Sequence, residues 1–170
     1  VISAETEEVV REFVSIDGIP DAGISAKIEG FAYPSDPLTA HGLAFEEVQY
    51  TSPIGELGAW LVEGTRPTWA LFVHGKGSNR REALRMLPAV VAEGFPSLVI
   101  TYRNDEGMPL SEDGYYNYGT TEWGDLEGAA EYALSHGAEG LVLVGYSMGG
   151  AIAISFQYES SIADRVRGVI

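Results

Sequence analysis

The stretch LVLVGYSMGG, residues 141–150, decides the fold of this chain. Four apolar residues lead to Gly145, and a run of small and apolar residues, AIAISF, follows at 151–156. A short apolar run bounded by glycine is typical of a buried strand, and the segment after it favours a helix. Ser147 is therefore expected at a strand-to-helix turn, where glycines let the backbone bend sharply. Its hydroxyl would either cap that helix or be exposed for chemistry.

Further apolar runs along the chain predict more buried strands. They lie at residues 69–73, 97–102 and 166–170, and segments 44–51 and 56–64 are expected to form a hairpin. Two segments between the runs, 80–93 and 123–136, are each followed by a glycine and are predicted to be helices. Strands buried on both faces belong to parallel sheets that helices cover. The sequence therefore predicts an α/β fold, a three-layer sandwich with a mostly parallel sheet and helices on both faces.

Composition divides the chain into an N-terminal appendage, 1–43, and the N-terminal portion of an α/β domain, 44–170. Residues 18–42 are rich in glycine, proline, serine and aspartate, which predicts irregular structure, and a short amphipathic helix is expected at 4–14. The chain begins with Val1 rather than methionine. A membrane anchor is expected only if a further segment precedes it, and the compartment stays open between cytoplasmic and extracytoplasmic.

Charge and residue usage exclude several classes of function. The chain has 25 acidic and 10 basic residues, a net charge of -15, which disfavours nucleic acid and anionic membranes as partners. It has no cysteine, so thiolate chemistry is excluded. The histidines His41, His74 and His136 show no metal-ligand spacing, so we expect no metal and no cofactor. His74 is expected to be a packed, hydrogen-bonded residue that supports the loop it begins.

A second motif, HGKG at 74–77, follows the expected strand 69–73. A backbone N–H in such a loop can face the serine turn and supply half of an oxyanion hole. We expect that donor to be the N–H of Lys76, with Gly77 as the alternative. The other donor is expected to be the N–H of Met148, directly after the serine.

The long loop 103–122 is rich in tyrosine. Loops at this edge of an α/β sheet border the ligand crevice, so Tyr115 and Tyr116 are candidates to line a substrate pocket. The alternative is that these rings only pack the loop against the protein. Arg103 and Asp125 stand at the two ends of the loop and are expected to form an ion pair that fixes it.

Three motifs in this order, VHGKG, ITYRNDEG and VGYSMGGAIA, resemble the α/β-hydrolase superfamily of serine hydrolases. The sequence is most similar to the monoacylglycerol-lipase-like and serine-aminopeptidase-like branch, over about residues 44–170. The resemblance implies Ser147 as nucleophile, a histidine as general base and an acid that orients it, in the chain order Ser, acid, His. It implies a small-molecule carboxylic ester as substrate, cleaved through an acyl-enzyme, with an amide or a thioester as the lesser alternatives.

The sequence departs from that pattern because all three histidines precede Ser147. Glu159 and Asp164, the acids after it, come before the expected strand 166–170 and so too early for the acid of the family. We expect the chain to stop after its sixth strand, with the acid, the base and the lid beyond Ile170. On that expectation the 170-residue chain alone is inactive. The alternative function is a non-catalytic, hydrolase-like binding module without a general base.

Overall fold

The computed structural model describes residues 18–19, 21–25, 30–33 and 35–170. The chain divides into two compact units, Val1–Gly30 and Phe31–Ile170. In the first unit, the N–H of Ile24 donates to the carbonyl of Asp21 in a turn, and the helix expected at 4–14 lies outside the described residues. The second unit contains the sheet, and it begins earlier in the sequence than the predicted boundary at residue 43.

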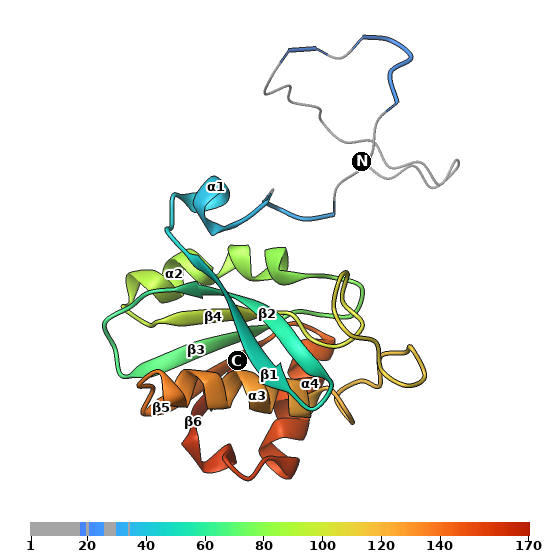
Figure 1. The fold of residues 1–170 in the computed structure, drawn as a ribbon. Coiled ribbons are helices and arrows are strands. Elements are labelled where there is room, and N and C mark those ends of the chain that lie inside the picture. Colours follow the sequence, from blue (N-terminus) through green and yellow to red (C-terminus); the bar gives the residue numbers. More distant parts are fainter. Residues whose placement is uncertain (1–17, 20, 26–29, 34) are drawn as a thin grey trace, which may run out of the picture. The chain divides into compact units, whose positions relative to one another are not determined.

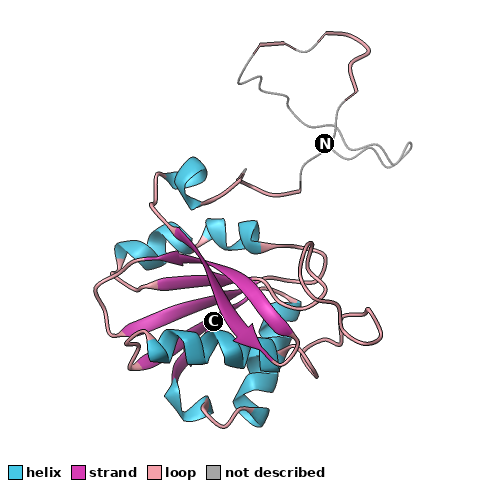
Figure 2. Ribbon diagram, viewed as in Figure 1, coloured by secondary structure: helices cyan, strands magenta, loops and turns pink. Residues whose placement is uncertain are grey.

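The second unit consists of six strands and the helices that cover them (Figures 1 and 2). The strands are β1 (Glu46–Ser52), β2 (Gly55–Val62), β3 (Thr68–Val73), β4 (Ser97–Ile100), β5 (Gly140–Gly145) and β6 (Val166–Val169). The helices are α1 (Pro37–His41), α2 (Leu87–Ala92), α3 (Trp123–Ser135), α4 (Met148–Glu159) and the 3-10 helices η1 (Arg80–Arg85) and η2 (Ala163–Arg165). Among the described residues, no helix combines the length and the hydrophobicity needed to cross a lipid bilayer.

The strands form one mixed sheet in the order β1-β2-β4-β3-β5-β6. β1, β2 and β4 pair antiparallel, whereas β3 pairs parallel with β4 and β5, and β5 pairs parallel with β6. The predicted mostly parallel sheet is thus confirmed. β3 and β5 are in register from Thr68 opposite Gly140 to Val73 opposite Gly145. Because both strands end at the same level, the loop after β3 and the turn after β5 begin side by side.

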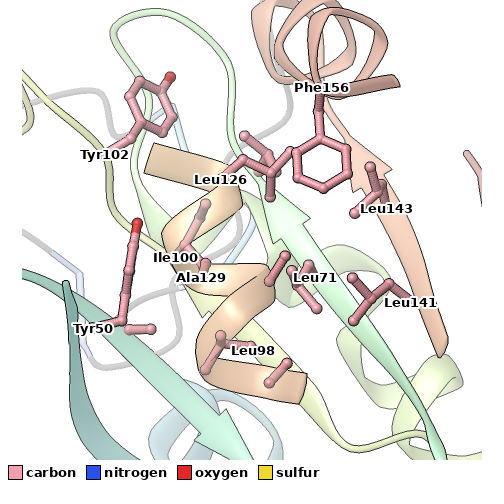
Figure 3. Packing of buried hydrophobic residues seen from close by; sticks show 14 of the residues in the cluster. Tyr50, Leu71, Leu98, Ile100, Tyr102, Leu126, Ala129, Leu141, Leu143 and Phe156 are labelled. Atoms are coloured by element: carbon pink, nitrogen blue, oxygen red, sulfur yellow. The ribbon is translucent and has the colours of Figure 1, made fainter. Parts of the chain in front are cut away.

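Each face of the sheet carries its own hydrophobic core. On one face, Leu71 and Leu141 pack against Leu126 of α3 and Phe156 of α4 (Figure 3). On the other face, Phe72, next to Leu71 in β3, belongs to a second cluster that includes apolar side chains of η1 and α2. Alternate residues of a strand point to opposite faces, and both faces are covered here. The continuous apolar runs of the sequence follow from this double burial.

The segment predicted as one helix over 80–93 is two short helices, η1 and α2. Pro88 has no N–H, so it cannot donate to the carbonyl of Leu84 as a continuous helix would require. That carbonyl instead lies 2.8 Å from Nε2 of His41, which donates to it. A histidine outside the helix thus satisfies the acceptor that the proline leaves open.

Candidate active site

Ser147 lies in the turn between β5 and α4, as predicted. Its backbone angles are φ 50° and ψ −113°, a combination that residues other than glycine rarely adopt. Such a conformation costs on the order of 1–3 kcal/mol and persists only where the surrounding structure imposes it. The residue is exposed, and its side chain makes no capping hydrogen bond to α4. The hydroxyl is therefore presented to its surroundings and does not serve as a helix cap.

Two glycines impose this turn through close backbone packing. A Cβ atom at Gly149 would lie 2.1 Å from the carbonyl oxygen of Val73 and 2.8 Å from that of His74. A Cβ atom at Gly145 would lie 2.6 Å from the carbonyl carbon of Gly149. Contacts this short leave no room for any side chain. The first turn of α4 therefore rests directly on the end of β3, and this places Ser147 against the HGKG loop.

Gly75 is the residue of that loop that meets the serine turn. A Cβ atom added there would lie 3.2 Å from Cβ of Ser147 and 3.1 Å from the carbonyl oxygen of Tyr146. The two motifs that the sequence places 70 residues apart are thus in contact, as the paired ends of β3 and β5 require.

The polar groups of the peptides on either side of Gly75 are almost all engaged. The Tyr102 hydroxyl donates to the carbonyl oxygens of His74 and Gly75, at 3.0 and 3.3 Å. The carbonyl of Gly75 also accepts from Nδ1 of His74 at 2.9 Å and from the N–H of Ser78 at 3.1 Å. The N–H of Gly75 donates to Oε2 of Glu82 at 2.8 Å. Both peptide planes are therefore fixed from several sides.

One group of these peptides, the N–H of Lys76, has no partner among the described residues. In a trans peptide this N–H points opposite to the carbonyl of Gly75, and hence away from the buried groups that hold that carbonyl. The N–H groups of Gly77 and Met148 likewise donate to no other described residue. The donors that the sequence predicted for an oxyanion hole are therefore available.

His74 is the packed, hydrogen-bonded histidine that we expected. Its Nε2 lies 2.8 Å from Oδ2 of Asp105, and both side chains are buried. Its Nδ1 lies 2.9 Å from the carbonyl oxygen of Gly75, so both ring nitrogens are hydrogen-bonded to neighbouring groups. Asp105 also accepts from the N–H of Tyr102 and from the hydroxyl of Tyr116. Both ring nitrogens of His74 are thus engaged with groups other than Ser147.

The phenols around this pair remain protonated at neutral pH. Burial raises the pKa of Tyr102, and the charge of Asp105 raises it further. The same two causes, in the same order, raise the pKa of Tyr116. Burial also raises the pKa of Tyr146, next to the serine, to about 12, and the charge of Glu82 adds to this shift. Tyr102 and Tyr116 can therefore act as hydrogen-bond donors across the physiological range.

The two tyrosines proposed to line a pocket have different positions. Tyr116 borders a hollow of about 450 Å³, which Gly77 and Asp105 also line. Tyr115 is 73% exposed and does not border it. Ser147 is not among the residues that line this hollow either. The structure thus brings Gly77 of the HGKG loop and Tyr116 to one hollow.

The remaining candidates serve the structure. Arg103 and Asp125 form the predicted ion pair, with Nε and Oδ2 2.8 Å apart. His136 bonds to the carbonyl of Tyr132, and the side chain of Lys76 donates to the hydroxyl of Tyr118. Within the described residues, no group of three or more His, Cys, Asp or Glu side chains is placed to hold a metal ion.

Sequence reasoning did not identify three residues that shape the site: Tyr102, Asp105 and Glu82. The first two belong to the ITYRNDEG motif, so its position after a buried strand was a signal that could have found them. Glu82 stands in a run of charged residues, RRE, and nothing in that pattern distinguishes it from a solvated side chain.

A scan against protein-family models and a search of curated proteins found no match. Solved structures do match. An esterase from Pyrococcus furiosus superposes with a TM-score of 0.66 at 19% identity, over 81% of this chain and 55% of that one. A thermophilic esterase from Thermogutta terrifontis superposes with a TM-score of 0.57 at 25% identity, over 73% of this chain and 44% of that one. An alpha/beta hydrolase from Novosphingobium aromaticivorans superposes with a TM-score of 0.58 at 20% identity, over 74% of this chain and 42% of that one.

The chain thus spans about half the length of the solved structures it matches. This chain contains the mixed sheet, the turn with Ser147 and the loop after β3. Its strand order and its helices on both faces agree with the three motifs that first suggested the family. The chain therefore has the fold of the α/β-hydrolase superfamily.

Proposed function

We propose that this chain carries the nucleophile and the oxyanion hole of a serine hydrolase that cleaves a carboxylic ester. The observation that carries the proposal is the strained, exposed Ser147 beside a loop in which the N–H groups of Lys76 and Gly77 donate to no other described residue. Strain at an exposed nucleophile is what a catalytic turn requires, because it holds the hydroxyl away from the helix. The hydrolases and esterases among the structural neighbours support the same class of reaction.

In the proposed reaction, Oγ of Ser147 attacks the ester carbonyl carbon while a base removes its proton. The carbonyl oxygen becomes an oxyanion, which accepts hydrogen bonds from the N–H groups of Met148 and Lys76, with Gly77 as the alternative. The N-terminus of α4 also favours this negative charge. Collapse of the intermediate releases the alcohol, which takes the proton from the base, and leaves the acyl group on the serine. Water then repeats the sequence and releases the acid.

The base is the part of this mechanism that the three histidines do not provide. His74 is bound to Asp105 and Gly75, His41 to the carbonyl of Leu84, and His136 to the carbonyl of Tyr132. We propose that the base and its orienting acid come from outside the described residues. A serine without its base keeps only the contribution of the oxyanion hole and of binding, about 10³- to 10⁴-fold over water.

The test compares the 170-residue chain with a protein that extends past Ile170. Both are treated with a fluorophosphonate probe and with p-nitrophenyl esters of short acids. We expect the longer protein to be labelled on Ser147 and to lose at least about 10³-fold in kcat on Ser147→Ala, because no other group forms the acyl-enzyme. Ser135→Ala, an exposed serine at the end of α3, is the matched control and should stay active.

Several outcomes would contradict the proposal. Labelling of another residue, or full turnover by the Ser147→Ala variant, would show that the reaction does not pass through this serine. A longer protein that is folded but neither labelled nor active would instead favour the non-catalytic binding module. Ser147-dependent turnover by the 170-residue chain would place the base among its own three histidines.

A further inference from the structure

The carboxylate of Glu82 accepts a hydrogen bond from the backbone of the HGKG loop. Oε2 of this residue accepts the N–H of Gly75 at 2.8 Å, and it lies 3.4 Å from where a Cβ atom of Gly75 would be. Among the described residues, no lysine or arginine forms a salt bridge with it. A carboxylate usually stays solvated or pairs with a cation at a protein surface. Here the half-buried carboxylate receives a backbone amide instead.

The segment 75–82 is built to hold that carboxylate in place. Asn79 caps the N-terminus of η1, and its side chain accepts the N–H of Arg81 at 3.0 Å. The N–H of Glu82 donates to the carbonyl of Asn79 at 3.0 Å, which closes the first turn of η1. Because the loop leads directly into this turn, the Glu82 carboxylate lies beside Gly75, the first residue of the same segment. The position of Gly75 therefore depends on η1.

The peptide between His74 and Gly75 is held at both ends. Its carbonyl accepts from the Tyr102 hydroxyl and its N–H donates to Glu82. A hydrogen bond to an ionised acceptor is roughly twice as strong as one between neutral groups. The next peptide along the chain carries the N–H of Lys76. A movement of Gly75 would thus displace that N–H relative to the neighbouring Ser147.

We propose that Glu82 is a positioning residue of the oxyanion hole, which holds Gly75 so that the N–H of Lys76 stays directed at the reacting carbonyl oxygen. This inference rests on the proposed hydrolase function. The carboxylate acts through the geometry of the loop, because a negative charge near an oxyanion would itself oppose catalysis. A neutral acceptor at the same place should therefore serve nearly as well as the carboxylate.

The experiment compares Glu82→Ala, Glu82→Gln and the control Glu93→Ala in a protein that extends past Ile170. Glu93 is an exposed glutamate at the end of α2, far in sequence from the loop. We expect Glu82→Ala to lower kcat by about 10- to 100-fold with KM within about twofold, since a misdirected oxyanion donor affects the transition state more than ground-state binding. Glu82→Gln should stay within about threefold of the parent, because its side-chain oxygen can still accept the amide. Glu93→Ala should not change kcat.

A second measurement does not depend on turnover. The Gly75 amide proton is expected at low field in a ¹H–¹⁵N spectrum, because it donates to a carboxylate. It should move upfield in Glu82→Ala and less so in Glu82→Gln, while other amides of the sheet keep their positions.

Several results would overturn the inference. Unchanged kcat in Glu82→Ala, or an unchanged Gly75 amide shift, would show that the carboxylate does not position the loop. Equal losses in Glu82→Ala and Glu82→Gln, with equal losses in melting temperature, would show a purely structural role. If the parent protein has no turnover that depends on Ser147, the proposed function fails, and the positioning role fails with it.

Discussion

The two halves of the candidate site are held in place by different forces. The turn 145–150 is fixed by backbone atoms in van der Waals contact, and glycine is needed at 145 and 149 because nothing larger fits there. The loop 74–78 is fixed by hydrogen bonds from side chains, among them Tyr102 and Glu82. The turn is thus held by steric contacts, and the loop is held by hydrogen bonds.

Because of this difference, changes in the turn should affect the stability of the domain, and changes around the loop should affect the orientation of its peptides. A side chain added to the turn must push the end of β3 away from α4, so it disturbs the core of the domain. A hydrogen bond removed from the loop leaves the core in place and releases one peptide plane. We therefore expect substitutions in the turn to act mainly on the free energy of unfolding, and substitutions around the loop to act mainly on turnover.

The largest effect is expected for Gly149→Ala. Its methyl group would lie 2.1 Å from the carbonyl oxygen of Val73, so backbone must move. We expect a loss of about 3 kcal/mol in the free energy of unfolding, measured by urea denaturation. Gly150→Ala is the control in the same helix, since its added methyl group would meet no atom closer than the Gly145 carbonyl oxygen at 3.8 Å. It should be neutral or stabilising by up to about 1 kcal/mol. Equal stabilities of the two variants would disprove the steric account.

An intermediate effect is expected for Tyr102→Phe. This change removes the hydroxyl that donates to His74 and Gly75, and it keeps the ring that stacks on the His74 imidazole at 4.3 Å between ring centres. We expect kcat to fall about 10-fold, and the free energy of unfolding to fall by about 1 kcal/mol as one bonded donor is lost. Tyr158→Phe, at an 84% exposed position, should change neither quantity. A loss in stability without a loss in kcat would mean that the hydroxyl holds the core and not the loop.

The smallest effect is expected between two variants that both lack the nucleophile, Ser147→Gly and Ser147→Ala. Alanine keeps the strain of φ 50°, whereas glycine adopts that angle without a steric penalty. Glycine also gains more entropy in the unfolded chain, which offsets part of the relief. We expect the glycine variant to be more stable by about 1 kcal/mol in thermal or urea unfolding. If alanine proves equal or better, the turn does not store strain at this residue.

Local pattern determined the architecture of this chain and the turn that carries Ser147. Apolar runs identified β3, β4 and β5 because these strands are largely buried on both faces of the sheet. The run at 166–170 predicted a buried strand too, but β6 is only partly buried. The turn with Ser147 was also predictable, because its glycines and its serine lie within five residues. The HGKG loop was found from its own four residues, and the oxyanion donors proposed in it stay a prediction. The ion pair between Arg103 and Asp125 was also predictable, because the two residues flank one loop.

Only the tertiary structure decided what holds the site together. Tyr116 borders the hollow and Tyr115 does not, although they are adjacent in the sequence, because successive side chains of a folded loop face different surroundings. The bonds from Tyr102 and Asp105 to the start of the HGKG loop join residues about thirty positions apart. A hydrogen bond depends on distances and angles between particular atoms, which the order of β4 beside β3 creates. The sequence shows which polar groups could form hydrogen bonds, and the packing of the sheet decides which of them come within bonding distance.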